Sequence, residues 1–99
     1  MRGGAQSDTL LGGRGNDTLE GGAGPDTLRG SRGHDTLRGD SGEDFLYGQA
    51  GDDDLYGGEH DDFLDGNAGD DFCNGGSGAD TRCRCESSSN NLEFFCFLP

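Results

Sequence analysis

The sequence predicts an all-β fold: a right-handed parallel β-roll of about four and a half 18-residue coils, followed by an irregular C-terminal tail. Two observations predict it: a nine-residue period runs through most of the chain, and apolar residues are too few for a conventional core. Hydrophobic residues make up 28% of the 99 residues, whereas 21 are glycine and 20 are acidic against 7 basic. Because a formal net charge of −13 opposes compaction, we expect the chain to be disordered without a cation.

The nine-residue period begins at Gly3 and continues without an insertion to Cys83. Written as nine lines, the chain has the consensus G-G-x-G-x-D-x-L-x, as in residues 12–20. Glycine occupies position 1 and aspartate position 6 in every line, and all 21 glycines fall at positions 1, 2 or 4. A flexible glycine-rich linker would scatter its glycines, so this register indicates a repeat fold over residues 3–83.

Each repeat is expected to form a turn followed by a short strand. Glycines at positions 1, 2 and 4 permit positive φ, which allows six residues to turn tightly. The last three positions alternate in polarity, so their middle residue should point inward. The expected inward residues are Leu10, Leu19, Leu28, Leu37, Leu46, Leu55, Leu64 and Cys73. Two such units close one coil, and stacked coils form two parallel sheets around a thin leucine core.

Stacking places the turns of repeats two apart over one another, so the position-6 aspartates form two columns of carboxylates that repel. We expect a hard divalent cation between each pair, with turn carbonyls completing the all-oxygen shell that Ca²⁺ accepts at about 2.3–2.6 Å. Magnesium demands a tighter geometry, and zinc or copper favour His and Cys, which the turns nearly lack. The expected ligands are the side chains of Asp8, Asp17, Asp26, Asp35, Asp44, Asp53, Asp62, Asp71 and Asp80, and the backbone carbonyls of Gly12, Gly15, Gly21, Gly24, Gly30, Gly33, Gly39, Gly42, Gly48 and Gly51. Seven such pairs predict about seven Ca²⁺ ions, which would take the net charge from −13 to about +1.

Residues 12–29 resemble the nonapeptide repeats of the RTX, or haemolysin-type calcium-binding, proteins, and the resemblance covers residues 3–83. It implies a bacterial module that binds Ca²⁺ through turn aspartates and carbonyls. It also implies secretion of the unfolded chain through a type I channel, followed by folding in extracellular calcium. The repeats of that family perform no chemistry and usually lie C-terminal to a protease, lipase, toxin or adhesin domain, so we expect this chain not to be an enzyme.

Some repeats depart from the consensus. Position 4 carries Gln6 and His60, so those turns are expected to be distorted or less well populated, with His60 as a tolerated left-handed residue. Position 2 varies, and we expect the backbone carbonyl to serve there whatever the side chain. The residues concerned are Ser31, Asp40, Gln49 and Asn67.

Residues 84–99 form the tail, and the roll is expected to fray where Arg82 occupies the last inward position. The apolar stretch 92–99 has three open interpretations: a C-terminal secretion signal, a cap that folds onto exposed aromatic residues such as Phe45 and Phe63, or disorder. The cysteines match no strong zinc spacing, and a disulfide such as Cys83 or Cys85 to Cys96 is one alternative. The four cysteines are Cys73, Cys83, Cys85 and Cys96.

Other functions find little support in the sequence. Scattered arginines indicate no nucleic-acid site, no apolar run reaches the roughly 18 residues of a membrane span, and we expect a monomer. The lipase-like stretch 75–79 lacks the last glycine of the nucleophile motif, and it lies in an expected calcium turn. An ice-binding or adhesive face would need a regular Thr or Asn ladder, but Phe45 and Phe63 interrupt the Thr9 column.

A further alternative is a non-catalytic remnant or fragment of a larger RTX toxin, hydrolase or adhesin. The repeats begin at Gly3, so any catalytic partner is expected on another polypeptide or to have been lost. No hydrophobic signal segment follows Met1, so any secretion address is expected elsewhere in the chain.

Overall fold

The computed structural model describes residues 2–67, 69, 71–78, 81–83 and 87–88. These residues form short β-strands and contain no helix. The strands are β1 (Arg2–Gly4), β2 (Thr9–Gly13), β3 (Thr18–Gly22), β4 (Thr27–Ser31), β5 (Thr36–Arg38), β6 (Phe45–Tyr47), β7 (Asp54–Tyr56), β8 (Phe63–Asp65), β9 (Phe72–Asn74), β10 (Thr81–Cys83) and β11 (Ser87–Ser88). No helix in this part of the chain could cross a membrane.

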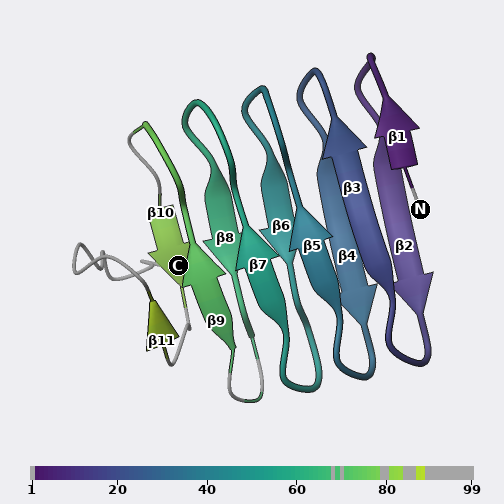
Figure 1. The fold of residues 1–99 in the computed structure, drawn as a ribbon. Helices are drawn as coiled ribbons and strands as arrows, with labels where there is room; N and C mark the ends of the chain where they lie inside the picture. Colours follow the sequence, from purple (N-terminus) through teal and green to yellow (C-terminus); the bar gives the residue numbers. More distant parts are fainter. Residues whose placement is uncertain (1, 68, 70, 79–80, 84–86, 89–99) are drawn as a thin grey trace, which may run out of the picture.

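Successive strands alternate between two parallel sheets, which face each other across a narrow interior (Figure 1). One sheet has the order β1-β3-β5-β7-β9-β11, and the other has the order β2-β4-β6-β8-β10. From β1 to β10, every paired residue lies 18 positions from its partner, as in Leu10 with Leu28 and Leu19 with Leu37. The prediction of an all-β parallel β-roll is therefore confirmed.

The core is a double row of side chains from the middle of each strand. Seven leucines and Cys73 form this apolar cluster, as the alternation of polarity predicts. Leu10, in the first coil, is 7% exposed, whereas the residues from Leu19 to Cys73 are fully buried. Because one residue per repeat fills the interior, burial contributes only about 1.5–3 kcal/mol for each repeat. The turns must therefore supply much of what holds the coils together.

Positions 2 and 4 of the turns are the ones that require the left-handed backbone conformation. All the glycines with positive φ among the described residues stand at these two positions. The non-glycine residues with positive φ replace glycine at the same two positions, and His60 is left-handed as expected. They are Ser31, Asp40, Gln49, His60 and Asn67, with φ between 64° and 77°. Gln6 does not share this conformation, so the first turn departs from the others.

The prediction that position-1 glycines also supply positive φ is wrong. None of the described position-1 glycines has positive φ. Their role is close approach: a Cβ atom on Gly12 would lie 2.8 Å from the carbonyl oxygen of Gly30 and 2.9 Å from Oδ2 of Asp17. Position 1 therefore excludes a side chain because the carboxylate of the same repeat, and at Gly12 also a carbonyl oxygen of the next coil, packs against its bare Cα atom.

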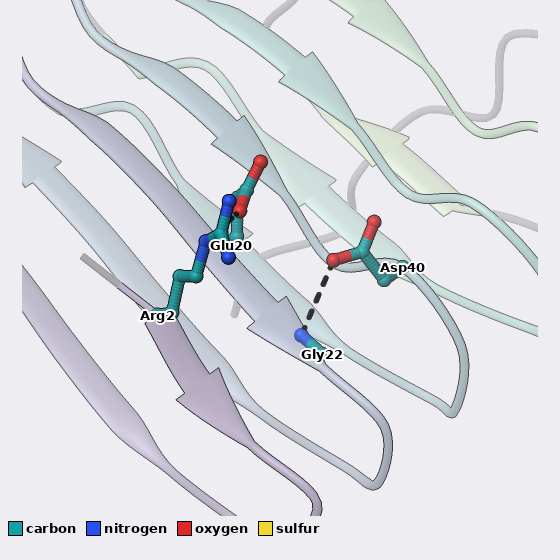
Figure 2. Close-up of polar contacts among 4 residues, drawn as sticks. All are labelled: Arg2, Glu20, Gly22 and Asp40. Carbon is teal, nitrogen blue, oxygen red and sulfur yellow. Dashed lines mark hydrogen bonds and ion pairs between the residues drawn. The ribbon is translucent and has the colours of Figure 1, made fainter.

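Side chains on the outer faces connect neighbouring coils. At the N-terminal end, Arg2 Nε lies 2.8 Å from Glu20 Oε1, and the Gly22 N–H donates to Asp40 Oδ2 at 3.3 Å (Figure 2). Further along, Arg29 lies over the ring of Tyr47, whose centroid is 5.4 Å away. Arg38 stacks on Tyr56 at the same distance in the other sheet. Phe63 contacts both Phe45 and Tyr47, at centroid distances of 6.1 and 5.9 Å.

The repeat register changes after β10. Strand β11 pairs with β9 at a spacing of 15 residues, with Ser87 beside Phe72 and Ser88 beside Cys73. Cys73 is disulfide-bonded. The alternative of a bond from Cys83 or Cys85 to Cys96 involves Cys96, which lies outside the described residues. The expected cap, secretion signal or disorder of residues 92–99 lies outside the described residues.

Candidate metal centre

The position-6 aspartates stand in two columns, one along each edge of the roll. Each turn ends in an aspartate immediately before its strand, so the 18-residue register places the aspartates of alternate repeats over one another. In each column, the backbone N–H of one aspartate donates to Oδ1 of the aspartate one coil further on. The pairs are Asp8 to Asp26, Asp17 to Asp35, Asp26 to Asp44, Asp35 to Asp53, Asp44 to Asp62 and Asp53 to Asp71, with distances of 2.7–2.9 Å.

The backbone of the same residues continues this connection. The carbonyl of Asp8 accepts a hydrogen bond from the N–H of Thr27 at 2.8 Å, and the equivalent bond joins Asp17 to Thr36. In Asp26, Asp35, Asp44 and Asp53, both backbone groups and one carboxylate oxygen are thus used in stacking the coils. The remaining carboxylate oxygen is the group available for another purpose.

That remaining oxygen, Oδ2, is buried and lacks a hydrogen-bond partner in at least six repeats. The atoms concerned belong to Asp8, Asp17, Asp26, Asp35, Asp44 and Asp53. Asp26, Asp35, Asp44 and Asp53 are each only 1% exposed. A buried carboxylate oxygen without a partner costs on the order of 1–3 kcal/mol or more, so a repeated set of them indicates a missing ligand.

From Asp8 to Asp62, Oδ2 packs against the position-1 glycine of its own repeat, and at Gly3, Gly12, Gly39 and Gly57 a carbonyl of the next coil lies beside it. A Cβ atom on Gly57 would lie 2.6 Å from Oδ2 of Asp62 and 2.7 Å from the carbonyl oxygen of Gly75. On Gly3 it would lie 2.5 Å from Oδ2 of Asp8 and 2.7 Å from the Gly21 carbonyl oxygen. A carboxylate oxygen and a main-chain oxygen from consecutive coils therefore converge in the turn, and only oxygen atoms are offered, as Ca²⁺ prefers.

The predicted position-4 carbonyls occupy a different part of the turn. They face the position-4 glycine of the next coil: a Cβ atom on Gly33 would collide with the Gly15 carbonyl, and one on Gly51 would collide with the Gly33 carbonyl. The structure thus brings position-1 carbonyls and aspartate Oδ2 atoms together, and it places position-4 carbonyls along the axis between coils. Asp80, the last predicted ligand, lies outside the described residues.

Electrostatics in the two columns disfavour the ionised carboxylates. Burial raises the pKa of Asp44 to about 7, and the carboxylate of Asp26 in the same column adds to this effect. Burial likewise raises the pKa of Asp53 to about 7, helped by the charges of Asp71 and Asp35. The N–H bond that each carboxylate accepts from the preceding coil opposes the rise. A bound cation would reverse both unfavourable causes, because it offsets desolvation and screens the repulsion.

No group of three or more His, Cys, Asp or Glu side chains converges on one point in the described part of the chain. The candidate sites combine one carboxylate with main-chain oxygens, and such a site does not suit zinc or copper. The two histidines are engaged elsewhere: His34 Nδ1 lies 2.9 Å from the Asp52 carbonyl oxygen, and the Gly42 N–H donates to His60 Nδ1 at 3.1 Å.

The sequence predicted the aspartate columns, but it did not predict that Oδ1 would accept a hydrogen bond from the preceding coil while Oδ2 lies in the turn. The invariance of glycine at position 1 was the available signal, because only a close oxygen contact explains it once positive φ is absent.

Comparison with known proteins agrees with this geometry. The family model described as RTX calcium-binding nonapeptide repeat (4 copies) matches three segments of the chain, residues 1–28, 29–59 and 47–81. No curated protein matches the chain. Since the matched segments span residues 1–81 of 99, the chain belongs to the RTX calcium-binding nonapeptide repeat family, whose repeats form structural modules that bind calcium.

Proposed function

We propose that this chain is a secreted calcium-binding module that folds when it meets extracellular calcium, and that it binds about seven Ca²⁺ ions, one between each pair of stacked turns. The ligands are the position-6 aspartate side chains with main-chain carbonyls of the turns. Its role is structural rather than catalytic.

One observation carries this proposal: buried Oδ2 atoms without partners recur along both columns. A single orphaned carboxylate could be a local defect, but a set repeated in register from Asp8 to Asp53 is a property of the fold. Each of these oxygens faces a position-1 glycine, and in several repeats a carbonyl oxygen of the next coil stands beside it.

The residues at positions 1, 2, 4 and 6 of each repeat have different roles in holding the ion. Oδ1 accepts an N–H from the preceding coil, which orients the carboxylate and leaves Oδ2 directed into the turn. The bare Cα of position 1 lets the oxygens approach, and the left-handed residues at positions 2 and 4 shape the turn. Bound Ca²⁺ would supply positive charge and a flexible oxygen coordination shell.

Folding coupled to several ions gives a steep response. Each site adds about 1.4 kcal/mol of stability per tenfold excess of calcium over its dissociation constant, so about seven sites act together. The thin leucine core and the formal charge of −13 leave the calcium-free chain with little stability of its own. An unfolded chain inside the cell and a folded one outside would suit export through the type I secretion machinery of a bacterium, as the family resemblance implies.

The test is a calcium titration of the purified, metal-stripped chain, followed by far-ultraviolet circular dichroism from about 10 μM to 10 mM, with magnesium as control. A cooperative gain of β structure with calcium but not magnesium is expected. A chain that shows no transition up to 10 mM calcium would contradict the proposal.

Asp53 and Asp54 provide a matched pair of variants for this titration. Asp53 is 1% exposed and its Oδ2 has no partner, whereas Asp54 is exposed on strand β7. Asp53→Asn keeps an Oδ1 acceptor for the ladder but loses the carboxylate, so it should raise the calcium midpoint and remove about one bound ion. Asp54→Asn makes the same change in charge and should leave the ion count unchanged. Equal effects of the two variants would show that net charge alone controls the response.

A further inference from the structure

Asp40 is the only carboxylate at position 2 among the nine repeats, where the consensus has glycine. Its φ is 70°, so its backbone adopts the left-handed conformation of this position. Asp40 is exposed, and its side chain reaches back to the preceding coil, where the Gly22 N–H donates to Asp40 Oδ2 at 3.3 Å (Figure 2). Asp40 thus connects its own turn, residues 39–44, to the turn at residues 21–26.

The turn at residues 21–26 contains one of the buried carboxylate oxygens that have no hydrogen-bond partner. Asp26 is 1% exposed, and its Oδ2 would lie 2.6 Å from a Cβ atom on Gly21. Gly21 directly precedes Gly22, whose N–H donates to Asp40. The Asp26 N–H donates to Asp44 Oδ1 at 2.9 Å. Two carboxylates of the following turn therefore contact the turn that carries this oxygen.

The charge of Asp40 acts on the position-6 carboxylates of both turns. Burial raises the pKa of Asp26, and the charges of Asp8 and Asp40 add to the rise. Burial raises the pKa of Asp44 to about 7, and the charges of Asp26 and Asp40 add to this rise as well. Without a cation, Asp40 therefore disfavours the stacking of its turn on the preceding one. A bound Ca²⁺ would instead be attracted by the same charge.

Arginines near Asp40 have other partners. Arg2 lies in the same sheet and pairs with Glu20 (Figure 2), and Arg38, two residues before Asp40, lies over the ring of Tyr56. Among the described residues, no salt bridge involves Asp40. Its charge is therefore available to act on an ion between the two turns.

We propose that Asp40 strengthens calcium binding between the turns at residues 21–26 and 39–44, so that this site binds Ca²⁺ more tightly than sites without a carboxylate at position 2. The inference rests on the proposed calcium binding. No three carboxylates converge on one point in the described part of the chain, so Asp40 acts through its charge and not as a direct ligand. Because the same charge opposes stacking in the absence of calcium, Asp40 makes the fold depend more strongly on the ion.

The expected size of the effect follows from one negative charge beside a divalent ion. At the effective permittivity of a protein surface, such a charge changes the binding constant by about three- to tenfold. Because Asp40 is exposed, dissolved salt screens its charge, and the effect should shrink at high ionic strength. In saturating calcium, the folding equilibrium constant changes by the same factor as the affinity of the site.

The experiment measures the folding equilibrium constant by urea unfolding in saturating calcium, for the native chain, Asp40→Asn and Asp54→Asn. Asparagine keeps an oxygen acceptor for the Gly22 N–H and tolerates positive φ, so Asp40→Asn removes mainly the charge. Asp54, exposed on strand β7, provides the same change in net charge outside the turns. The constant should fall about three- to tenfold for Asp40→Asn in about 20 mM KCl and less than about twofold in about 500 mM KCl. Asp54→Asn should change it less than about twofold in either.

Gln49 provides the reverse test. It occupies position 2 in the other column of turns with φ of 71°, so Gln49→Asp places a carboxylate at the corresponding position. This variant should raise the folding constant about three- to tenfold in low salt, whereas Gln49→Asn should not. If Asp40→Asn does not fold even in calcium, the Gln49 variants decide the question.

Three results would overturn the inference while leaving calcium-dependent folding intact. They are equal constants for the native chain and Asp40→Asn in low salt, a loss at Asp40→Asn that salt does not reduce, and no gain for Gln49→Asp. A native chain that stays unfolded in calcium would overturn the proposed function, and the inference with it.

Discussion

Gly12 and Gly13 allow the candidate calcium site to be tested separately from backbone strain. Gly12, at position 1, has no positive φ, and a Cβ atom there would lie 2.8 Å from the Gly30 carbonyl oxygen and 2.9 Å from Asp17 Oδ2. Gly13, at position 2, has φ of 89°, and a Cβ atom there would meet no atom within 4 Å. The same substitution by alanine therefore displaces two proposed ligands at Gly12 and strains only the backbone at Gly13.

The two variants should differ in how their loss of stability depends on calcium. Gly13→Ala places a side chain in the left-handed region, which costs about 1–2 kcal/mol at any calcium concentration. Gly12→Ala removes the contribution of one site, which is about 1.4 kcal/mol at a tenfold excess of calcium over the dissociation constant and about 2.7 kcal/mol at a hundredfold excess. A fixed steric cost adds to this, because both displaced oxygens must move.

The assay is urea unfolding of both variants and the native chain at several calcium concentrations above the folding midpoint, followed by circular dichroism. The loss in free energy of unfolding should grow with calcium for Gly12→Ala and stay constant for Gly13→Ala. Isothermal titration calorimetry should find about one ion fewer for Gly12→Ala only. If both losses are independent of calcium, position 1 is a packing position and not part of a calcium site.

Three further predictions concern pH, the core and the turns. Burial raises the pKa of Asp44 and Asp53 to about 7, so these carboxylates bind protons more tightly in the folded chain than in the unfolded one. In EDTA, the stability of the fold should therefore be greatest near pH 4 and should be lost as the pH rises through about 7. Circular dichroism that shows more β structure at pH 8 than at pH 5 would contradict this prediction. Leu37→Ala leaves a cavity in the row of fully buried leucines and should lower the free energy of unfolding in saturating calcium by about 2–5 kcal/mol. A loss below about 1 kcal/mol would indicate a loosely packed interior. Ser31 has φ of 77°, so Ser31→Gly should raise the melting temperature by relieving about 1 kcal/mol of strain, whereas Arg32→Gly, which relieves none, should lower it.

The sheets and the core were predictable because they follow from the period alone. One apolar residue in each repeat, flanked by polar neighbours, fixes which side chain points inward, and the structure buries Leu19 through Leu64 accordingly. A period of nine with two strands per coil requires a register of 18, which the strand pairs confirm up to β10. Neither result depends on the detailed path of the turns.

The contacts inside the turns were less predictable because glycine is chosen for two different physical reasons. At positions 2 and 4 it supplies positive φ, and at position 1 it makes room for oxygen atoms. A glycine in a sequence does not reveal which constraint applies. Polar residues such as Ser31 and Asn67 replace it at position 2 and keep positive φ, whereas position 1 is glycine in all nine repeats. Close contacts alone do not separate the two cases, because a Cβ atom on Gly33 at position 4 would also collide with the Gly15 carbonyl.

The ends of the roll lay beyond the reach of the repeat pattern. Strand β1 begins before the first complete repeat, and β11 pairs at a spacing that the period does not contain. The disulfide at Cys73 was missed because the cysteine fills a leucine position and satisfies the pattern as an apolar residue. The nine-residue period predicts the structure of the repeats, but it does not predict how the roll begins or ends.

Counting the calcium ions bound per folded chain tests most directly whether the stacked turns are calcium sites. The full-length, oxidised chain would be folded in calcium, passed through a gel-filtration column equilibrated in the same calcium concentration, and analysed for protein and excess calcium. The stacked turns predict about seven ions per chain, lost together when the chain unfolds. A folded chain that carries one ion or none would show that the buried aspartate columns are stabilised in another way.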